Sequence, residues 1–173
     1  RALIAEGRGE KLAAWWVESR CRAAAAGDPA IPRYPLTPAI VAALFDVHRA
    51  RRLVRGLEGA ERALASEEAG LRESRDARVE TGRVRISRLL VVSADGSGRF
   101  YRQVSKLYDR FSNRLEVLLV TCDESALGAA IFGGGRRARA VLIDHKEAVV
   151  RILSILDEDL PEDEVAEDGL GDD

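Results

Sequence analysis

The chain has 173 residues, of which 46% are hydrophobic and 32% charged, and its formal net charge at pH 7 is −2. Such a chain has room for one domain with a hydrophobic core plus extensions, and its composition excludes an intrinsically disordered protein. No apolar run approaches the ~20 residues that span a bilayer, and no signal peptide is recognisable. We therefore expect no membrane partner and a location in the cytoplasm or, alternatively, in a mitochondrial or other organellar matrix.

Cysteine and methionine usage adds two expectations. Cys21 and Cys122 are too few and too far apart to suggest a disulfide framework, so we expect two reduced thiols in a reducing compartment. Methionine is absent, even at position 1, which predicts a processed product or a fragment.

The small net charge conceals two regions of opposite sign. Residues 157–173 hold ten acidic residues and no basic one, whereas residues 1–156 hold 27 basic and 19 acidic residues, a net charge of +8. Of the basic residues, 24 are arginines, whose planar donor fork suits phosphate groups. The body of the chain therefore has the charge of an anion-binding protein, and the acidic tail is expected to be disordered unless a partner holds it.

Residues 1–27 are predicted to form a helix that docks on a protein partner. Trp15 and Trp16 are adjacent, so at about 100° per residue both indoles cannot lie in one narrow stripe. Such a helix either lies between two surfaces or binds another protein, and we expect one indole to pack on a partner chain. Residues 28–36 are rich in proline and predict an extended linker.

Helical and strand patterns alternate through residues 37–156, the predicted main domain. Thr37 and Pro38 are residue types that cap and start a helix, and a short edge strand is expected around Leu53. A helix beginning at Leu57 then continues as a highly charged stretch.

Three short apolar runs at 89–92, 115–120 and 140–143 match strands buried on both faces of a sheet. The segments between them are long enough to cross over as helices, and a strongly apolar last helix is expected at 146–156. The pattern predicts an α/β fold, a three-layer α/β/α sandwich with a four-stranded mixed sheet, plus the N-terminal helix.

Patterns for catalysis, metal binding or cofactor binding are largely absent, so we expect a protein that is not an enzyme and has no metal or cofactor. Asp95-Gly96-Ser97-Gly98 follows a predicted strand, but Gly-x-Gly alone is a weak dinucleotide signal. A tight turn in which Ser97 or Asp95 caps the next helix fits it better. Cys122 has no base nearby in sequence and is interpreted as a buried thiol.

Two basic loops that contain glycine are the candidate binding elements. The first spans residues 49–56 together with Arg62, and the second spans residues 133–139. Glycine lets a backbone approach phosphate closely, and arginine supplies charge-assisted donors, although a floppy loop with solvated arginines would show the same composition. Because both loops join elements of one small sandwich, they are expected to form one rim that faces RNA.

The strings RRLVRGLEGAERAL, LLVVSAD and LEVLLVTCDESALGAAIFGGGRRARAVLID resemble the kink-turn RNA-binding ribosomal protein superfamily (L-seven-Ae and L-thirty-e) and its bacterial ribosome-associated relatives. The resemblance implies an α/β/α sandwich from about Thr37 to Leu156. It also implies RNA contacts by a Gly-x-Asn-Glu-x-x-Lys turn, which corresponds here to residues 56–62, with Glu58 at the asparagine position. The family's Leu-Gly-x-Ala turn corresponds to residues 127–130, and the loop after that turn also contacts RNA.

The sequence therefore predicts non-catalytic binding of structured RNA by a component or associate of a ribosome or other ribonucleoprotein in translation, and we expect this RNA to be ribosomal. The expected RNA-binding residues are Arg52, Arg55, Gly56, Glu58, Arg62, Gly128, Gly133, Arg136, Arg137 and Arg139. One alternative is the substrate-binding portion of an RNA ribose methyltransferase whose catalytic domain is missing. Another is a scaffold in a large assembly that has lost RNA binding and is held by its N-terminal helix and acidic tail.

Overall fold

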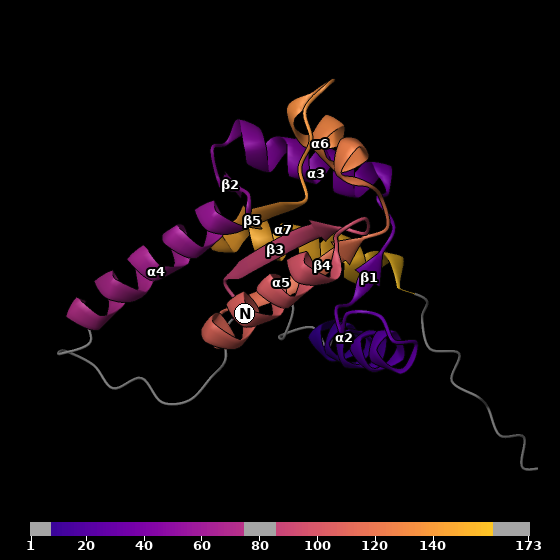
Figure 1. The fold of residues 1–173 in the computed structure, drawn as a ribbon, viewed down its shortest axis with the longest axis horizontal. Helices are drawn as coiled ribbons and strands as arrows, with labels where there is room; N and C mark the ends of the chain where they lie inside the picture. Colours follow the sequence, from indigo (N-terminus) through magenta and orange to yellow (C-terminus); the bar gives the residue numbers. More distant parts are fainter. Residues whose placement is uncertain (1–7, 75–85, 161–173) are drawn as a thin grey trace, which may run out of the picture.

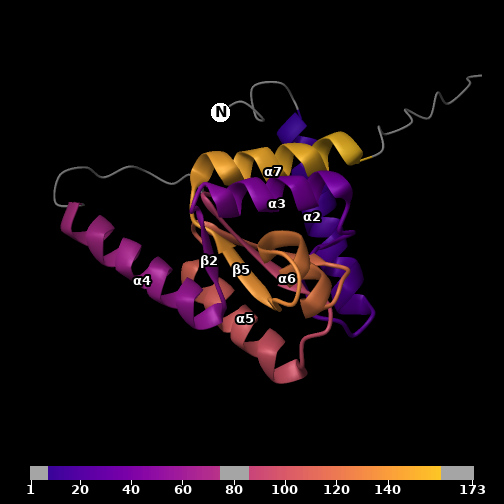
Figure 2. The same cartoon turned by 90° about the horizontal axis from the view of Figure 1, so that it is seen from above.

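The computed structural model describes residues 8–74 and 86–160, which form helices on both faces of one mixed sheet (Figure 1, Figure 2). The helices are α2 (Arg8–Ala25), α3 (Pro38–Arg49), α4 (Leu57–Ser74), α5 (Gly98–Phe111), α6 (Glu124–Phe132) and α7 (Lys146–Asp159). The strands are β1 (Arg33–Tyr34), β2 (Leu53–Arg55), β3 (Arg88–Ser93), β4 (Leu115–Val120) and β5 (Ala140–Ile143). None of the described helices combines the length and apolar character needed to cross a bilayer.

The sheet confirms the predicted α/β class and corrects the strand count from four to five. Its order is β1-β4-β3-β5-β2, in which β4 pairs in parallel with β1 and β3, while β5 pairs antiparallel with β3 and β2. The three apolar runs of the sequence form the three inner strands, and the short strand near Leu53 forms one edge.

The additional strand, β1, lies in the segment predicted to be a linker. Proline excludes a helix there, but an edge strand tolerates it because only one side of the backbone has to pair. The carbonyl oxygens of Pro32 and Tyr34 accept hydrogen bonds from Leu119 N and Thr121 N at 2.9 and 3.0 Å. The missing N–H groups of the prolines are therefore not needed, and residues 28–36 belong to the sandwich.

Two hydrophobic cores lie on opposite faces of the sheet because successive side chains of each strand point to opposite sides. On β3, Leu89 and Val91 pack with α3, α6 and α7, whereas Leu90 and Val92 pack with α4 and α5. Figure 2 shows α3 and α7 side by side on one face and α4 and α5 on the other. The second half of α4 extends beyond the sheet in both views.

Helix α2 packs on its own domain, contrary to the expectation that one indole packs on a partner. Trp16 is only 7% exposed and donates a hydrogen bond from Nε1 to Glu116 Oε2 at 2.9 Å. Trp15 packs edge-on against Trp16 and Tyr34, with centroid distances of 5.5 and 6.2 Å. Adjacent indoles fit here because the helix lies between two surfaces of the same chain, the outer part of the sheet and α7.

Glu116 also binds Arg20, whose guanidinium donates to Oε2 at 2.7 Å and to the hydroxyl of Tyr108 at 2.8 Å. Burial raises the pKa of Glu116, although Arg20 and Trp16 favour its carboxylate form. These contacts join α2 to β4 and α5 through a partly buried polar cluster.

Helix α7 runs three residues further than the sequence predicted and includes the start of the acidic tail. Asp157 is only 7% exposed, and Asp159 accepts a hydrogen bond from the hydroxyl of Tyr34. Burial and the Asp159 contact both raise the pKa of Tyr34. The predicted disorder of the tail beyond Leu160 lies outside the described residues.

Candidate nucleic-acid interface

Four strands have one of their ends at the same side of the sheet. The register pairs Ser93 with Val120, Val92 with Ala140 and Arg55 with Val141, so β3, β4 and β2 end where β5 begins. The helices α4, α5 and α6 start at this same edge because each follows one of those strands. We call this side, which includes residues 55–62, 93–98, 121–124 and 133–140, the binding edge.

The last two residues of the first basic loop, Arg55 and Gly56, meet the second basic loop at the binding edge. Gly56 N donates a hydrogen bond to Ala140 O at 2.8 Å, and the guanidinium of Arg55 donates to Arg137 O. Arg55 also lies over the ring of Phe132, with its Cζ atom 5.3 Å from the ring centroid. Gly56 has a φ of 80°, a conformation that favours glycine and turns the chain directly into α4.

The glycine-rich loop at 133–139, called the glycine loop below, folds back on α6. A Cβ atom at Gly128 would lie 2.0 Å from Arg136 O, so only glycine lets the loop backbone approach the helix this closely. Ala138 N donates to Glu124 O at 2.8 Å and holds the other end of the loop. Gly133 ends α6 with a φ of 83°. The backbone of residues 136–138 is therefore packed against α6.

The arginines of the glycine loop have different partners. Arg139 forms an ion pair with Glu124 at 2.9 Å, and Arg137 approaches the same carboxylate at 3.7 Å. Arg136 is exposed and forms no ion pair with any residue that the structure describes. Arg136 is therefore the loop arginine whose donors are most available to an anion, whereas Arg139 is partly committed to the fold.

Arg52 lies at the opposite edge of the sheet and corrects the prediction that it belongs to the same rim. Its guanidinium contacts His145 Nδ1 at 3.1 Å and Glu147 at 3.7 Å, beyond the end of β5. The reason is the length of β2. This strand rises about 3.3 Å per residue, so it separates Arg52, before its start, from Arg55, at its end.

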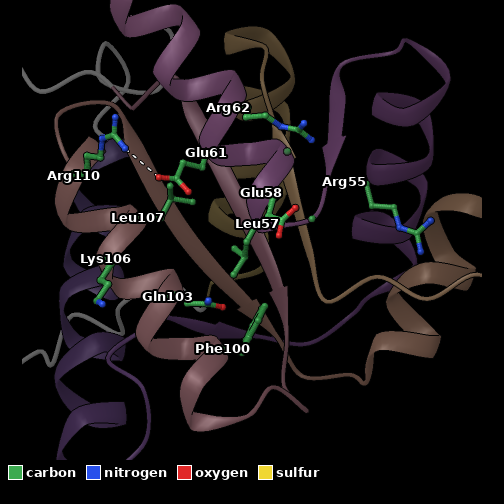
Figure 3. A pocket seen from close by; sticks show the side chains of 12 residues that line it. Arg55, Leu57, Glu58, Glu61, Arg62, Phe100, Gln103, Lys106, Leu107 and Arg110 are labelled. Atoms are coloured by element: carbon green, nitrogen blue, oxygen red, sulfur yellow. Dashed lines mark hydrogen bonds and ion pairs between the residues drawn. The ribbon is translucent and has the colours of Figure 1, made fainter.

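The predicted turn at residues 56–62 opens α4 and lines a cavity of about 650 Å³ beside α5 (Figure 3). Glu58 and Arg62 are both exposed and point to the side of α4 where Arg55 lies. Gly59 faces the sheet, where a Cβ atom would meet Val54 Cγ1 at 3.0 Å. The structure thus brings Arg55, Gly56, Glu58 and Arg62 together. The α5 wall was not among the residues predicted from the sequence.

A polar cluster that the sequence analysis did not predict links β3 to α6. Asp95 Oδ1 accepts hydrogen bonds from Ser93 Oγ at 2.7 Å and from Glu124 N at 3.1 Å. Partial burial would raise the pKa of Asp95, but these hydrogen bonds and the charge of Arg139 hold it below its usual range. Asp95 thus helps to cap α6, while Ser97 caps α5 by accepting from Phe100 N at 3.2 Å.

Neither cysteine nor any acidic cluster forms an evident chemical centre among residues 8–74 and 86–160. Burial and the nearby carboxylates of Asp123 and Asp95 raise the pKa of Cys122 to about 11, which opposes thiolate formation at neutral pH. No group of three or more potential metal ligands is found in these described ranges.

Comparisons with known proteins leave the family of the chain open. No family model matches the chain, and no curated protein matches it. One similar solved structure is that of a protein with unknown function from Bacillus halodurans, which is 18% identical, with a TM-score of 0.45. The match covers 68% of this chain and 95% of that chain. Any function of the binding edge therefore has to follow from its own geometry.

Proposed function

We propose that the protein binds structured RNA without catalysis, as a component or associate of a ribosome or other ribonucleoprotein. The observation that carries the proposal is the contact between the two basic loops, in which Arg55 donates to the carbonyl of Arg137. Arginines far apart in the sequence thereby share one surface with the exposed glycines of the glycine loop. Phosphate contacts of this kind position folded RNA, and unpaired bases can add sequence preference.

The charge of the chain supports the same ligand class. Asp157, Glu158 and Asp159 belong to α7, so these three acidic residues are counted with the body of the chain and not with the tail. Residues 1–160 then hold 27 basic and 22 acidic residues, a net charge of +5. This charge is smaller than the +8 counted from the sequence alone but retains its sign. Within the binding edge, Glu124 neutralises part of Arg139, so Arg55, Arg62 and Arg136 are the arginines proposed to contact phosphate first.

The decisive measurement is the affinity for a folded RNA hairpin as a function of salt concentration. Counterion release predicts that log K falls with log salt, by about 0.7–0.9 per neutralised phosphate. Arg136→Gln should weaken binding and reduce this slope by about 1. Arg49→Gln is the matched control, because Arg49 is also exposed but ends α3 at the opposite edge. An affinity that does not depend on salt, or equal effects of the two variants, would refute the proposal.

A second candidate, a protein-interaction scaffold, is favoured by an apolar depression between α3 and α6. It has a volume of about 580 Å³ and includes Phe45, which is 44% exposed. Exposed apolar patches of this kind often mark protein contacts. If Phe45→Ser abolishes co-purification of a protein partner while the hairpin shows no salt-dependent binding, the scaffold replaces RNA binding as the proposed function.

A further inference from the structure

The cavity beside α4 is a groove whose two ends are cationic and whose middle is apolar. Its lining residues are Arg55, Gly56, Leu57, Glu58, Gly59, Glu61, Arg62, Phe100, Gln103, Lys106, Leu107 and Arg110. Figure 3 shows Arg55 and Arg62 on one side of α4 and Lys106 and Arg110 on the other. Leu57 and Phe100 lie between these two ends.

The charge of the groove favours a polyanion over a neutral ligand. Four cationic side chains face two carboxylates, and one of these, Glu61, already pairs with Arg110 at 3.1 Å. The remaining charges are three cations against Glu58 alone. Phosphates spaced along a strand match separated cations better than a single compact anion does, because each cation can neutralise a different phosphate.

The middle of the groove suits a base. Leu107 is buried and Phe100 is half-buried, so both are held in place by the core while contributing to the groove surface. An aromatic ring can stack with any base, which makes such a contact tolerant of sequence. Gln103 is exposed beside them and can donate to and accept from the edge of a base.

The dimensions and position of the groove indicate one strand and not a duplex. The groove has a volume of about 650 Å³, which is enough for a short stretch of one chain of nucleotides but not for a duplex. The α5 wall from Phe100 to Arg110 is about 15 Å long at 1.5 Å per residue. The groove also includes Arg55, which contacts the glycine loop. A strand leaving the binding edge can therefore enter the groove directly.

We infer that this groove holds a single-stranded extension of the RNA whose folded part contacts the glycine loop. The inference rests on the proposed function and specifies its ligand as an RNA with a junction between paired and unpaired segments. Phosphates lie on Arg55 and Arg62 at one end and on Lys106 at the other. A base lies against Phe100 between them.

The experiment compares a fluorescent RNA hairpin with the same hairpin carrying an unpaired extension of about six nucleotides, within the range bound by single-strand grooves. The extension should tighten binding and steepen the salt dependence by about 0.7, for the one further phosphate on Lys106, because Arg55 and Arg62 already contact the hairpin. Lys106→Gln should remove most of this gain, while Lys146→Gln, at an exposed position on α7, should not.

The stacking contact is tested with Phe100→Leu, which retains apolar volume but removes the aromatic ring. Loss of a stacked base should weaken binding of the extended RNA by about fivefold or more and leave the plain hairpin unchanged. Phe45→Leu on α3 is the matched control. Thermal unfolding of each variant checks the fold, and Lys106→Gln gives an independent result because Lys106 is exposed.

The outcomes separate this inference from the proposed function. If both RNAs bind equally and neither Lys106→Gln nor Phe100→Leu discriminates between them, the groove is not a strand site, while hairpin binding still supports the proposed function. If neither RNA binds with salt dependence, the proposed function fails and the inference fails with it. A gain from the extension that both Lys106→Gln and Phe100→Leu reduce supports both.

Discussion

Gly128 offers the sharpest test of how the binding edge is built. In the interior of a helix, replacing glycine by alanine normally stabilises the fold by about 1 kcal/mol, because alanine loses less backbone entropy. At Gly128, however, the added Cβ would lie 2.0 Å from Arg136 O and 2.7 Å from Arg137 Cα. Both contacts are with backbone atoms, so no side chain can rotate away to relieve them.

We expect Gly128→Ala to destabilise the protein despite its better helix propensity. Overpacking costs about 1–3 kcal/mol, and a required displacement of about 1 Å in backbone points to the upper end of that range. After the gain in propensity is subtracted, the net loss in the free energy of unfolding should be roughly 2 kcal/mol. Because the displaced backbone belongs to the glycine loop, hairpin affinity should also fall.

The assay is urea unfolding followed by circular dichroism, with Gly70→Ala as the matched control. Gly70 is also in a helix, but a Cβ there would meet no atom within 4 Å, so that variant should be unchanged or more stable by up to about 1 kcal/mol. Equal stability of the two variants, or a stabilised Gly128→Ala, would show that the loop does not pack on α6 as described. Normal hairpin affinity in a destabilised Gly128→Ala would show that the position of the glycine loop does not control RNA binding.

Three further predictions concern titrating groups and the tail. Because burial raises the pKa of Cys122 to about 11, only about one Cys122 thiol in a thousand is ionised at pH 8. Iodoacetamide should therefore alkylate the exposed Cys21 first. Mass spectrometry that shows the reverse order would contradict the burial of Cys122. The lowered folded-state pKa of Asp95 means that its carboxylate stabilises the fold above about pH 4, and that this contribution is lost as pH falls through the lowered pKa. Asp95→Asn should therefore be less stable than the unmodified protein in urea at pH 7, with a difference that narrows at about pH 3; a difference independent of pH would be inconsistent with a charge effect. Residues 161–173 hold seven acidic residues, which can compete with phosphate for the arginines within the Debye length of ~8 Å. Removal of these residues should therefore tighten hairpin binding. Unchanged affinity would assign the tail another role.

Much of the fold could be predicted from local patterns. The apolar runs at 89–92, 115–120 and 140–143 became the three central strands because burial on both faces leaves a continuous apolar signature. Thr37 caps α3 as expected, accepting a hydrogen bond from Ile40 N at 3.3 Å. Strand β1 has only two residues between prolines and carries no periodic signal, so only its pairing with β4 reveals it.

The candidate site was harder to predict because its geometry depends on distant contacts. The glycines and arginines of both loops were visible in the sequence, but the sequence did not show that β2 places Arg52 and Arg55 at opposite ends of the strand. Asp95 was considered as a cap for its own following helix, whereas its carboxylate helps to cap α6 from across the sheet. The stripe of Phe100, Gln103 and Lys106 has helical spacing, yet only the placement of α4 turns it into one wall of a groove.

The alternation of β3 gives experimental access to the two faces of the molecule separately. Val91 contributes to the core beneath α3, α6 and α7, and its neighbour Val92 contributes to the core beneath α4 and α5. A methyl-labelled or spectroscopic probe at one of these positions would therefore report on one helical layer, and the same probe one residue further would report on the other. Binding in the α4–α5 groove and binding in the α3–α6 depression could be distinguished in this way by probes whose backbone atoms are a single peptide unit apart.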